Sequence, residues 1–288
     1  MIRFGFVKPA SVEEACDFLA GANGKSCVVA GGTDFMVQIH EKDKRWKDLE
    51  YAVDISDLKE LKGICVDGDT VHVGALTSHT EAQFSDVLNA NGKLLSMACG
   101  TVGAPQIRNR GTIGGAIGNA SPASDPVPAL IALEAQAVVM GPNGKRTIPM
   151  SEMITRPGKT ALAEGEIITE VFFKSVAGMR STFVKLGRRK ALSISRMNVS
   201  VVAHQDENGV IDYIRLAPGC VFATPERATK AEAMLLGQKP DAALLEAASK
   251  AVGDEMVERT GVRWSTEYKQ PVIAALVRRA LEEVLEVK

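Results

Sequence analysis

Residues 110–125 read RGTIGGAIGNASPASD, a stretch of small polar residues that contains four glycines. Glycine has no Cβ, so the backbone there can approach a ligand closely and can adopt positive φ. Backbone N–H groups turned the same way form an anion-binding concavity, to which small hydroxyls add further donors. The stretch therefore favours a loop that holds a diphosphate and a polyol, with a glycine-rich turn in a β-rich region as the alternative.

A second stretch upstream strengthens the ligand-binding interpretation. Residues 27–30 (CVVA) are apolar, and Gly31-Gly32-Thr33-Asp34 follows at once. This pattern predicts a buried strand that ends in a tight turn, after which Thr33 or Asp34 caps a helix beginning near Phe35. We expect the two glycine loops to clamp one diphosphate between them. We also expect a side chain at Gly32 or Gly114 to occupy the space of that diphosphate.

The rest of the chain predicts alternating helices and strands, with a boundary near residues 175–179. Ser11 and Glu14 form a capping box at the start of a helix that runs to about Leu19. Before the boundary, strands are expected at 26–30, 51–55 and 166–173, hairpins at 63–75 and 135–148, a helix at 80–97, and a short helix at 128–133. Beyond it, three antiparallel strands (181–185, 198–205, 210–216) precede three helices (225–236, 241–252, 271–287).

Composition narrows the classes of function. The net charge is −1 at a pI near 6.5, so no basic excess points to nucleic acid or an anionic membrane. No apolar run approaches the ~18 residues of a membrane span, and the N-terminus lacks the apolar core of a signal peptide, which favours the cytoplasm. The five cysteines are scattered without a CxxC pair, so we expect reduced thiols and neither a zinc site nor an iron–sulfur cluster.

Few residues suggest direct catalysis. None of the four histidines sits in a nucleophile pattern, and no set of side chains forms an acid–base or metal site. Asp125, at the end of the glycine stretch, can either accept hydrogen bonds from sugar or ribityl hydroxyls or cap the helix that follows. Lys185 begins the one basic cluster, which continues at Arg188-Arg189-Lys190. For Arg189 and Lys190 a solvated strand end is the better interpretation.

The ordered set of motifs resembles a known family. Residues 30–34 (AGGTD) and 112–115 (TIGG) resemble the paired FAD-diphosphate motifs of the medium, flavin-binding subunits of molybdenum hydroxylases, such as xanthine, carbon monoxide and nicotinate dehydrogenases. The resemblance extends to residues 6–15 (FVKPASVEEA), 103–109 (GAPQIRN), 183–189 (FVKLGRR) and 225–228 (PERA), and to Tyr268-Lys269. Ala116 stands where many relatives have asparagine, and Lys269 where arginine is common. Neither change removes the backbone loop.

The resemblance implies an α+β fold and a specific division of the chain. Residues 1–176 would form a two-part FAD-binding domain of the PCMH (vanillyl-alcohol-oxidase-like) type, with subdomains of about 1–57 and 58–176. Residues 177–288 would form a C-terminal domain with a three-stranded antiparallel sheet and a helix bundle. The implied FAD-binding residues are Val29, Ala30, Gly31, Gly32, Thr33, Asp34, Phe35, Val102, Gly103, Ile107, Gly111, Thr112, Ile113, Gly114, Gly115, Asn119, Ser121, Ser124, Asp125, Ile168 and Lys185.

The resemblance also implies a function in electron transfer. Non-covalent FAD would take electrons from [2Fe–2S] clusters on a small partner subunit and pass them to NAD⁺ or another acceptor, such as ferredoxin or a quinone. The organic substrate would react on a large molybdopterin subunit, in a dimer of heterotrimers. Lys185 would lie near the flavin, and His79 is the one residue to consider for covalent attachment. The alternatives are a self-contained FAD-dependent oxidase or dehydrogenase, and a non-redox nucleotide-binding scaffold.

Overall fold

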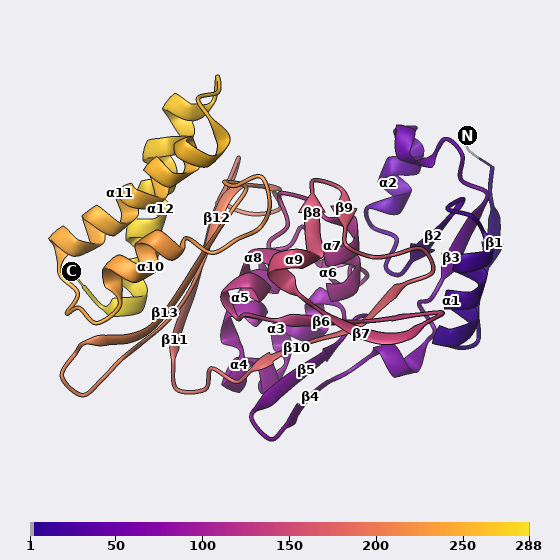
Figure 1. The fold of residues 1–288 in the computed structure, drawn as a ribbon, viewed down its shortest axis with the longest axis horizontal. Helices are drawn as coiled ribbons and strands as arrows, with labels where there is room; N and C mark the ends of the chain where they lie inside the picture. Colours follow the sequence, from indigo (N-terminus) through magenta and orange to yellow (C-terminus); the bar gives the residue numbers. More distant parts are fainter. Residues whose placement is uncertain (1–2, 288) are drawn as a thin grey trace.

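The computed structural model describes residues 3–287, which form three larger sheets, each accompanied by helices, and one two-stranded sheet (Figure 1). The N-terminal sheet lies at one end of the molecule, a five-stranded sheet with most of the short helices occupies the centre, and a three-stranded sheet with the C-terminal helices lies at the other end. This arrangement confirms the expected α+β fold class.

The N-terminal sheet is parallel, with strand order β1-β3-β2. Its helix α1 begins where expected, because the Ser11 side chain accepts a hydrogen bond from the Glu14 amide. The elements are β1 (Gly5–Val7), α1 (Val12–Gly21), β2 (Ser26–Val29), α2 (Phe35–His40), the 3₁₀ turn η1 (Lys44–Trp46), β3 (Tyr51–Asp54) and the 3₁₀ turn η2 (Lys59–Leu61).

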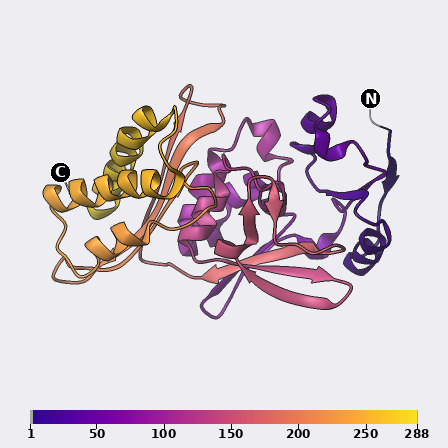
Figure 2. The same cartoon turned by 45° about the horizontal axis from the view of Figure 1, so that its top comes forward.

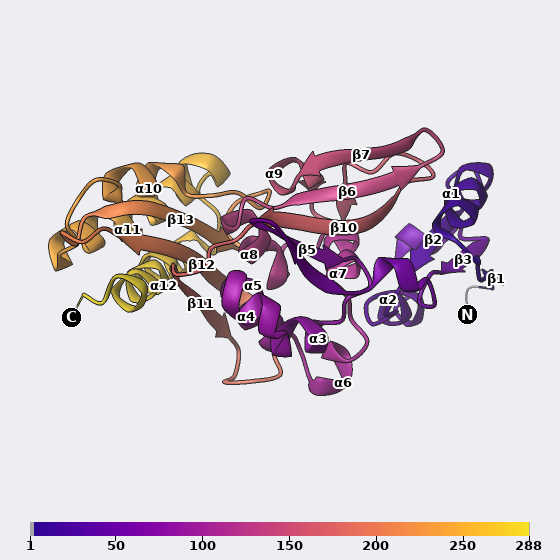
Figure 3. The same cartoon turned by 90° about the horizontal axis from the view of Figure 1, so that it is seen from below.

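The central sheet is antiparallel, with strand order β4-β5-β10-β6-β7. Its helices α3 to α8 gather on one face (Figure 3). The strands are β4 (Ile64–Asp67), β5 (Thr70–Gly74), β6 (Gln136–Gly141), β7 (Gly144–Pro149) and β10 (Ile167–Lys174), with a small pair β8 (Ile154–Arg156) and β9 (Lys159–Thr160). The helices are α3 (His79–Phe84), α4 (Asp86–Asn91), α5 (Lys93–Gly100), α6 (Pro105–Arg108), α7 (Ile113–Asn119), α8 (Pro126–Ala132) and α9 (Met150–Met153).

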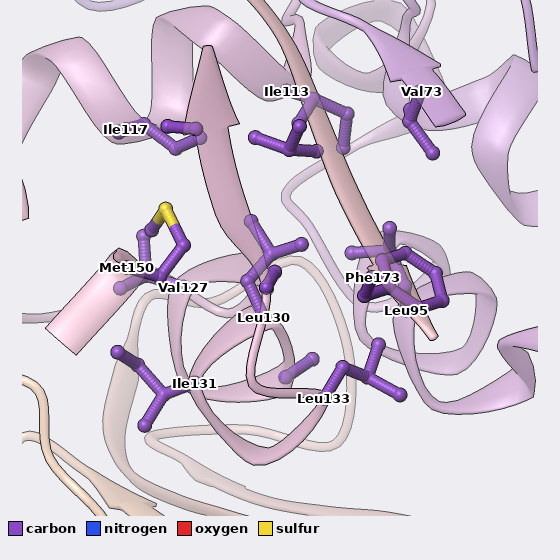
Figure 4. Close-up of a cluster of buried hydrophobic side chains, with 14 of the residues drawn as sticks. Val73, Leu95, Ile113, Ile117, Val127, Leu130, Ile131, Leu133, Met150 and Phe173 are labelled. Carbon is purple, nitrogen blue, oxygen red and sulfur yellow. The ribbon is translucent and has the colours of Figure 1, made fainter. Parts of the chain in front are cut away.

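The largest hydrophobic core lies between this sheet and these helices. Ile113 and Ile117 of α7, Leu130 of α8 and Phe173 of β10 converge there (Figure 4). Ile113 and Ile117 present no surface to solvent, so the helix that follows the glycine loop is fixed by its apolar side chains. Phe183, Val202 and Ala217 of the C-terminal sheet join the same core, which therefore also fixes the C-terminal sheet against α8.

The C-terminal sheet pairs three long antiparallel strands in the order β11-β12-β13, with helices packed on one side (Figure 2). The elements are β11 (Arg180–Gly187), β12 (Ser195–Gln205), β13 (Ile211–Gly219), α10 (Thr229–Leu235), α11 (Ala242–Thr260) and α12 (Thr266–Leu285). All six were expected, although α11 extends eight residues beyond the predicted end at 252.

One expected element is wrong. The predicted helix over 80–97 is divided into α3, α4 and α5. Ser85 ends α3 and caps α4 by accepting from the Leu88 amide at 3.2 Å. Gly92 separates α4 from α5, and a Cβ on Gly92 would lie 2.6 Å from the Phe173 ring. The chain turns at Gly92 because only a residue without a side chain fits against Phe173.

Within residues 3–287, none of the helices combines the length and apolar character that crossing a bilayer requires.

Candidate functional site

A cavity of about 630 Å³ lies where the three parts of the molecule meet. Its walls come from the loop after β2, the helices α6 and α7, β10, and the loop between β11 and β12. Twenty of the twenty-one residues implied by the resemblance line it. The exception is Ile113, whose side chain is in the central core and whose amide donates to the Thr77 carbonyl at 3.0 Å.

The first glycine loop is shaped to present backbone donors. Gly32 has φ of +73°, which turns the chain directly after β2, and its carbonyl accepts from the Met36 amide. The amides of Gly31, Thr33 and Asp34 donate to no protein acceptor within the described chain. The first turn of α2 therefore receives no side-chain cap from Thr33 or Asp34, contrary to expectation. The loop instead forms a nest of free N–H groups, as an anion site requires.

The two glycine loops touch each other through their backbones. A Cβ on Gly31 would lie 1.9 Å from the Arg110 carbonyl oxygen and 3.0 Å from Cα of Gly111. No side chain fits in this gap. Gly31 therefore lets the N-terminal sheet approach the second loop, and this contact closes one side of the cavity.

Two amides of the second loop already have acceptors within the protein. The Gly114 amide donates to the Ala75 carbonyl at 2.8 Å, and the Gly115 amide donates to Oγ1 of Thr112, the N-cap of α7, at 3.0 Å. These donors are therefore taken by protein acceptors. A Cβ on Gly114 would lie 2.7 Å from Cβ of Ala75, so a side chain there would first collide with Ala75. That a side chain at Gly32 or Gly114 would displace a diphosphate stays a prediction.

Gly118 is the glycine of α7 that opens onto the cavity. It lines the cavity, and a Cβ built on it meets no atom within 4 Å. The second stretch thus offers a close backbone approach at Gly118, whereas its Gly114 and Gly115 amides are not free.

The Asp125 carboxylate is buried, with 4% of the residue exposed, and it receives four hydrogen bonds. Oδ1 accepts from Ser195 Oγ at 2.6 Å and from Asn198 Nδ2 at 3.1 Å. Oδ2 accepts from Thr101 Oγ1 at 3.1 Å and from Lys185 Nζ at 2.5 Å, so it forms a salt bridge between the central and C-terminal parts.

These partners give Asp125 a role beyond the two that the sequence left open. Its side chain caps no helix, although it stands at the N-cap position of α8. A carboxylate accepts about four hydrogen bonds, and all four positions of Asp125 are occupied by protein donors. Asp125 therefore organises the cavity wall through Lys185 and Ser195. Lys185 makes a second bond, to the Thr101 carbonyl at 2.9 Å, which fixes its ammonium at the edge of the cavity.

Two buried side-chain atoms of cavity-lining residues lack protein partners. The buried hydroxyl of Ser124 and the buried Nδ1 of His79 make no hydrogen bond in the described chain. The His79 ring lies beside Gly111, where a Cβ would come within 3.0 Å of it. Burial, together with the positive charge of Arg108, lowers the pKa of His79 to about 4. The imidazole is therefore neutral at pH 7.

Several residues that line the cavity were not predicted from the sequence. Gln38 and Trp46 lie beyond the first loop, and Leu192, Ile194 and Ser195 come from the loop after the basic cluster. Ile194 is 78% exposed, unusual for isoleucine, and such a residue is recognised only from the structure. Arg188, Arg189 and Lys190 are exposed, as the solvated-strand-end interpretation of Arg189 and Lys190 expected.

The cavity fits the cofactor that the resemblance implies. A dinucleotide needs an elongated site with anion donors at its middle, hydroxyl partners, and apolar walls for its rings. The free amides of the first loop and the unpaired hydroxyl of Ser124 supply the polar groups. Val102, Ile107 and Ile168 supply apolar surface.

Comparison with known proteins confirms the resemblance. Residues 2–173 match the family model described as "FAD binding domain in molybdopterin dehydrogenase", and residues 182–284 match "CO dehydrogenase flavoprotein C-terminal domain". The chain is 31% identical to the nicotinate dehydrogenase FAD-subunit of Eubacterium barkeri, over 99% of this chain and 97% of that protein. It is 31% identical to the carbon monoxide dehydrogenase medium chain of Hydrogenophaga pseudoflava, over 97% of this chain and 96% of that one.

A solved structure gives the same result. Carbon monoxide dehydrogenase from Hydrogenophaga pseudoflava, in a form lacking the Mo-pyranopterin moiety, contains a chain that superposes with a TM-score of 0.91 at 32% identity, covering 99% of both chains. Both the sequence and the fold therefore agree along nearly the full length. The chain belongs to the family of FAD-binding medium subunits of the molybdenum hydroxylases, which are oxidoreductases.

Proposed function

We propose that this chain is the electron-transfer flavoprotein of a three-subunit molybdenum hydroxylase. It would receive electrons from [2Fe–2S] clusters of a small partner subunit and deliver them to NAD⁺ or another acceptor, in the cytoplasm. The observation that carries the proposal is the cavity. Its lining includes the free amides of the first glycine loop, the unpaired hydroxyl of Ser124 and the ammonium of Lys185, which Asp125 holds in place. The family membership supports the same conclusion.

The cavity suggests how the cofactor would be held. The amides of Gly31, Thr33 and Asp34 would bind the diphosphate, and Ser121 and Ser124 would meet hydroxyls of the ribityl chain. At the C-terminal side, Lys185 would stand near the flavin, with Ile168 and Val102 as apolar walls. Asp125 would act by holding Lys185 in place, and the glycines of the implied set would act through their backbones. Bound FAD supplies the redox chemistry, which Lys185 would tune because a cation favours reduced, anionic flavin.

His79 bears on whether the cofactor is attached covalently. Its ring contacts Gly111 of the second loop, and its backbone amide donates to the Gly111 carbonyl at 3.0 Å. That position suits a neutral side chain that supports the turn beside the diphosphate. We therefore propose that FAD is bound non-covalently.

The assembly is proposed from the family and from this chain's cysteines. Cys16, Cys27, Cys65, Cys99 and Cys220 are scattered along the sequence without a CxxC pair, a spacing that suits no iron–sulfur cluster. The clusters and the molybdopterin would therefore belong to a small iron–sulfur subunit and a large subunit, and two such heterotrimers would form the complex. We also propose the division at about residue 176, with subdomains of about 1–57 and 58–176, which the three separate sheets support.

The proposed function predicts what the chain does alone. Expressed without partners and reconstituted with FAD, it should be yellow, and dyes should reoxidise it after reduction by NADH. Purines, nicotinate and aldehydes should not bleach the flavin anaerobically, because the cavity holds no set of groups that would activate a carbon. Absorbance spectroscopy checks both statements. Bleaching by an organic substrate would support the self-contained oxidase instead, and failure to take up flavin would support the scaffold. If only NADH fails, the acceptor would be ferredoxin or a quinone.

Valine substitutions at two glycines of α7 should have different effects, one on FAD binding and one on stability. Gly118→Val should weaken FAD binding by at least about tenfold without lowering stability, because its side chain would enter open cavity space. Gly114→Val should instead lower the free energy of unfolding by about 1–3 kcal/mol, because it overpacks against Ala75. Flavin titration and chemical denaturation separate the two. Full flavin occupancy in Gly118→Val would contradict the placement of the cofactor.

We expect substitutions of Asp125 and Lys185 to have strongly coupled effects on the free energy of unfolding. Asp125→Asn or Lys185→Met alone should lower the free energy of unfolding of the apo chain by about 3–5 kcal/mol, because each leaves one buried charge unpaired. The double variant should lose much less than the sum of the two single variants. Chemical denaturation of all four proteins measures the coupling, and additive losses would show that the pair is not a unit.

Burial of His79 should make the stability of the folded chain decrease in acid. Its pKa falls from 6.5 to about 4 on folding, so between these values only the unfolded chain binds the proton. The stabilisation is complete above pH 6.5 and is lost as the pH falls to about 4, a change of about 3 kcal/mol. His79→Gln should therefore show less loss of stability over this range. Denaturation at pH 7 and pH 4.5 tests this, and identical losses in both proteins would contradict it.

A further inference from the structure

Three side chains that line the cavity connect the N-terminal part to α7. Trp46 of η1 donates its indole N–H to Oε1 of Gln38 at 2.8 Å. Nε2 of Gln38 donates to Oδ1 of Asn119 at 3.0 Å. Gln38 belongs to α2, and Asn119 is the last residue of α7. All three line the cavity, and we call them the Trp46–Gln38–Asn119 strap.

The strap fixes the orientation of two amides that could otherwise flip. An indole N–H can only donate, so the oxygen of Gln38 must face Trp46. The NH₂ of Gln38 then faces Asn119, whose oxygen must face it in return. The NH₂ of Asn119 is left without a protein acceptor in the described chain, at the wall of the cavity. The indole N–H of Trp46 therefore determines which end of the Asn119 amide faces Gln38 and which end is free.

Trp46 is itself held in place. Its ring packs edge-on against Phe35 with centroids 5.6 Å apart, and Phe35 packs the same way against Phe4. Phe35 is also the first residue of α2, directly after the first glycine loop. Packing of Trp46 on Phe35 therefore links the strap to the segment that directly follows the first glycine loop.

The position of the strap indicates which part of the cofactor lies next to the free NH₂ of Asn119. Lys185 lies on β11, at the opposite side of the central helices from α2 (Figure 1). With the flavin near Lys185 and the diphosphate at the first loop, the strap adjoins the nucleotide half of the dinucleotide. We infer that Asn119 donates a hydrogen bond to an acceptor atom of the adenylate half of FAD, and that Gln38 and Trp46 are positioning residues that orient it. This inference rests on the proposed function and specifies its cofactor contacts.

The test compares FAD with FMN, which lacks the adenylate half. Both are titrated into the full chain by flavin fluorescence. Asn119→Ala should weaken FAD about tenfold, the effect of one hydrogen bond, and leave FMN within about twofold. Trp46→Phe and Gln38→Met should weaken FAD about threefold, because they free the Asn119 amide to rotate. Val37→Ala, on the exposed face of α2, is the matched control and should change neither affinity.

Coupling distinguishes positioning from simple bridging of the two walls. If Gln38 acts through Asn119, Gln38→Met should have no further effect in the Asn119→Ala background. Additive losses, equal losses for FAD and FMN, or an unchanged FAD affinity in Asn119→Ala would each overturn the inference while wild-type binding of FAD upholds the proposed function. FMN binding confirms that each variant is folded, and Asn119→Ser replaces Asn119→Ala if the latter does not fold. A wild-type chain that binds neither flavin would overturn both.

Discussion

A single buried carboxylate determines how the C-terminal part meets the cavity. Asp125 stands at the start of α8, and its four donors come from the end of α5, from β11 and from two places on β12. A buried ion pair is favourable only when its remaining hydrogen-bonding positions are also filled, and here they are. The arrangement holds Lys185 at the cavity edge and anchors Ser195, where the exposed loop over the cavity ends. The position of that wall therefore depends on groups 24 to 73 residues away from Asp125 in sequence.

The opposite wall depends on glycine conformation more than on charge. Gly32 turns the chain with positive φ and leaves amides free, while Gly31 allows backbone contact with Arg110. The first loop presents free amides, whereas the Gly114 and Gly115 amides of the second loop are taken by Ala75 and Thr112. Similar glycine patterns in sequence therefore serve different physical roles, which only the hydrogen-bond partners reveal.

Much of the fold and most of the cavity lining could be predicted from sequence, because alternation, turns and ordered motifs are local. The C-terminal strands and the two glycine loops are examples. The break at Gly92 could not be predicted, because its cause is contact with Phe173, 81 residues later. The saturation of Asp125 and the strap through Gln38 also arise from partners distant in sequence. Local patterns identify which residues line a site, whereas their polarity and remaining hydrogen-bonding capacity are set by tertiary contacts.

The hydrophobic clusters differ greatly in size between the two walls of the cavity. The wall carrying α7 and α8 belongs to the large central core, whereas α2 and η1 rest on a cluster of four buried residues, Cys27, Ile39, Leu49 and Ala52. Segments with few buried apolar contacts open locally at a lower free energy than the rest of the molecule. Amide hydrogens of α2 would therefore exchange with solvent ahead of those of α7. Local opening would therefore begin at α2 and η1, while α7 and α8 stay packed in the central core.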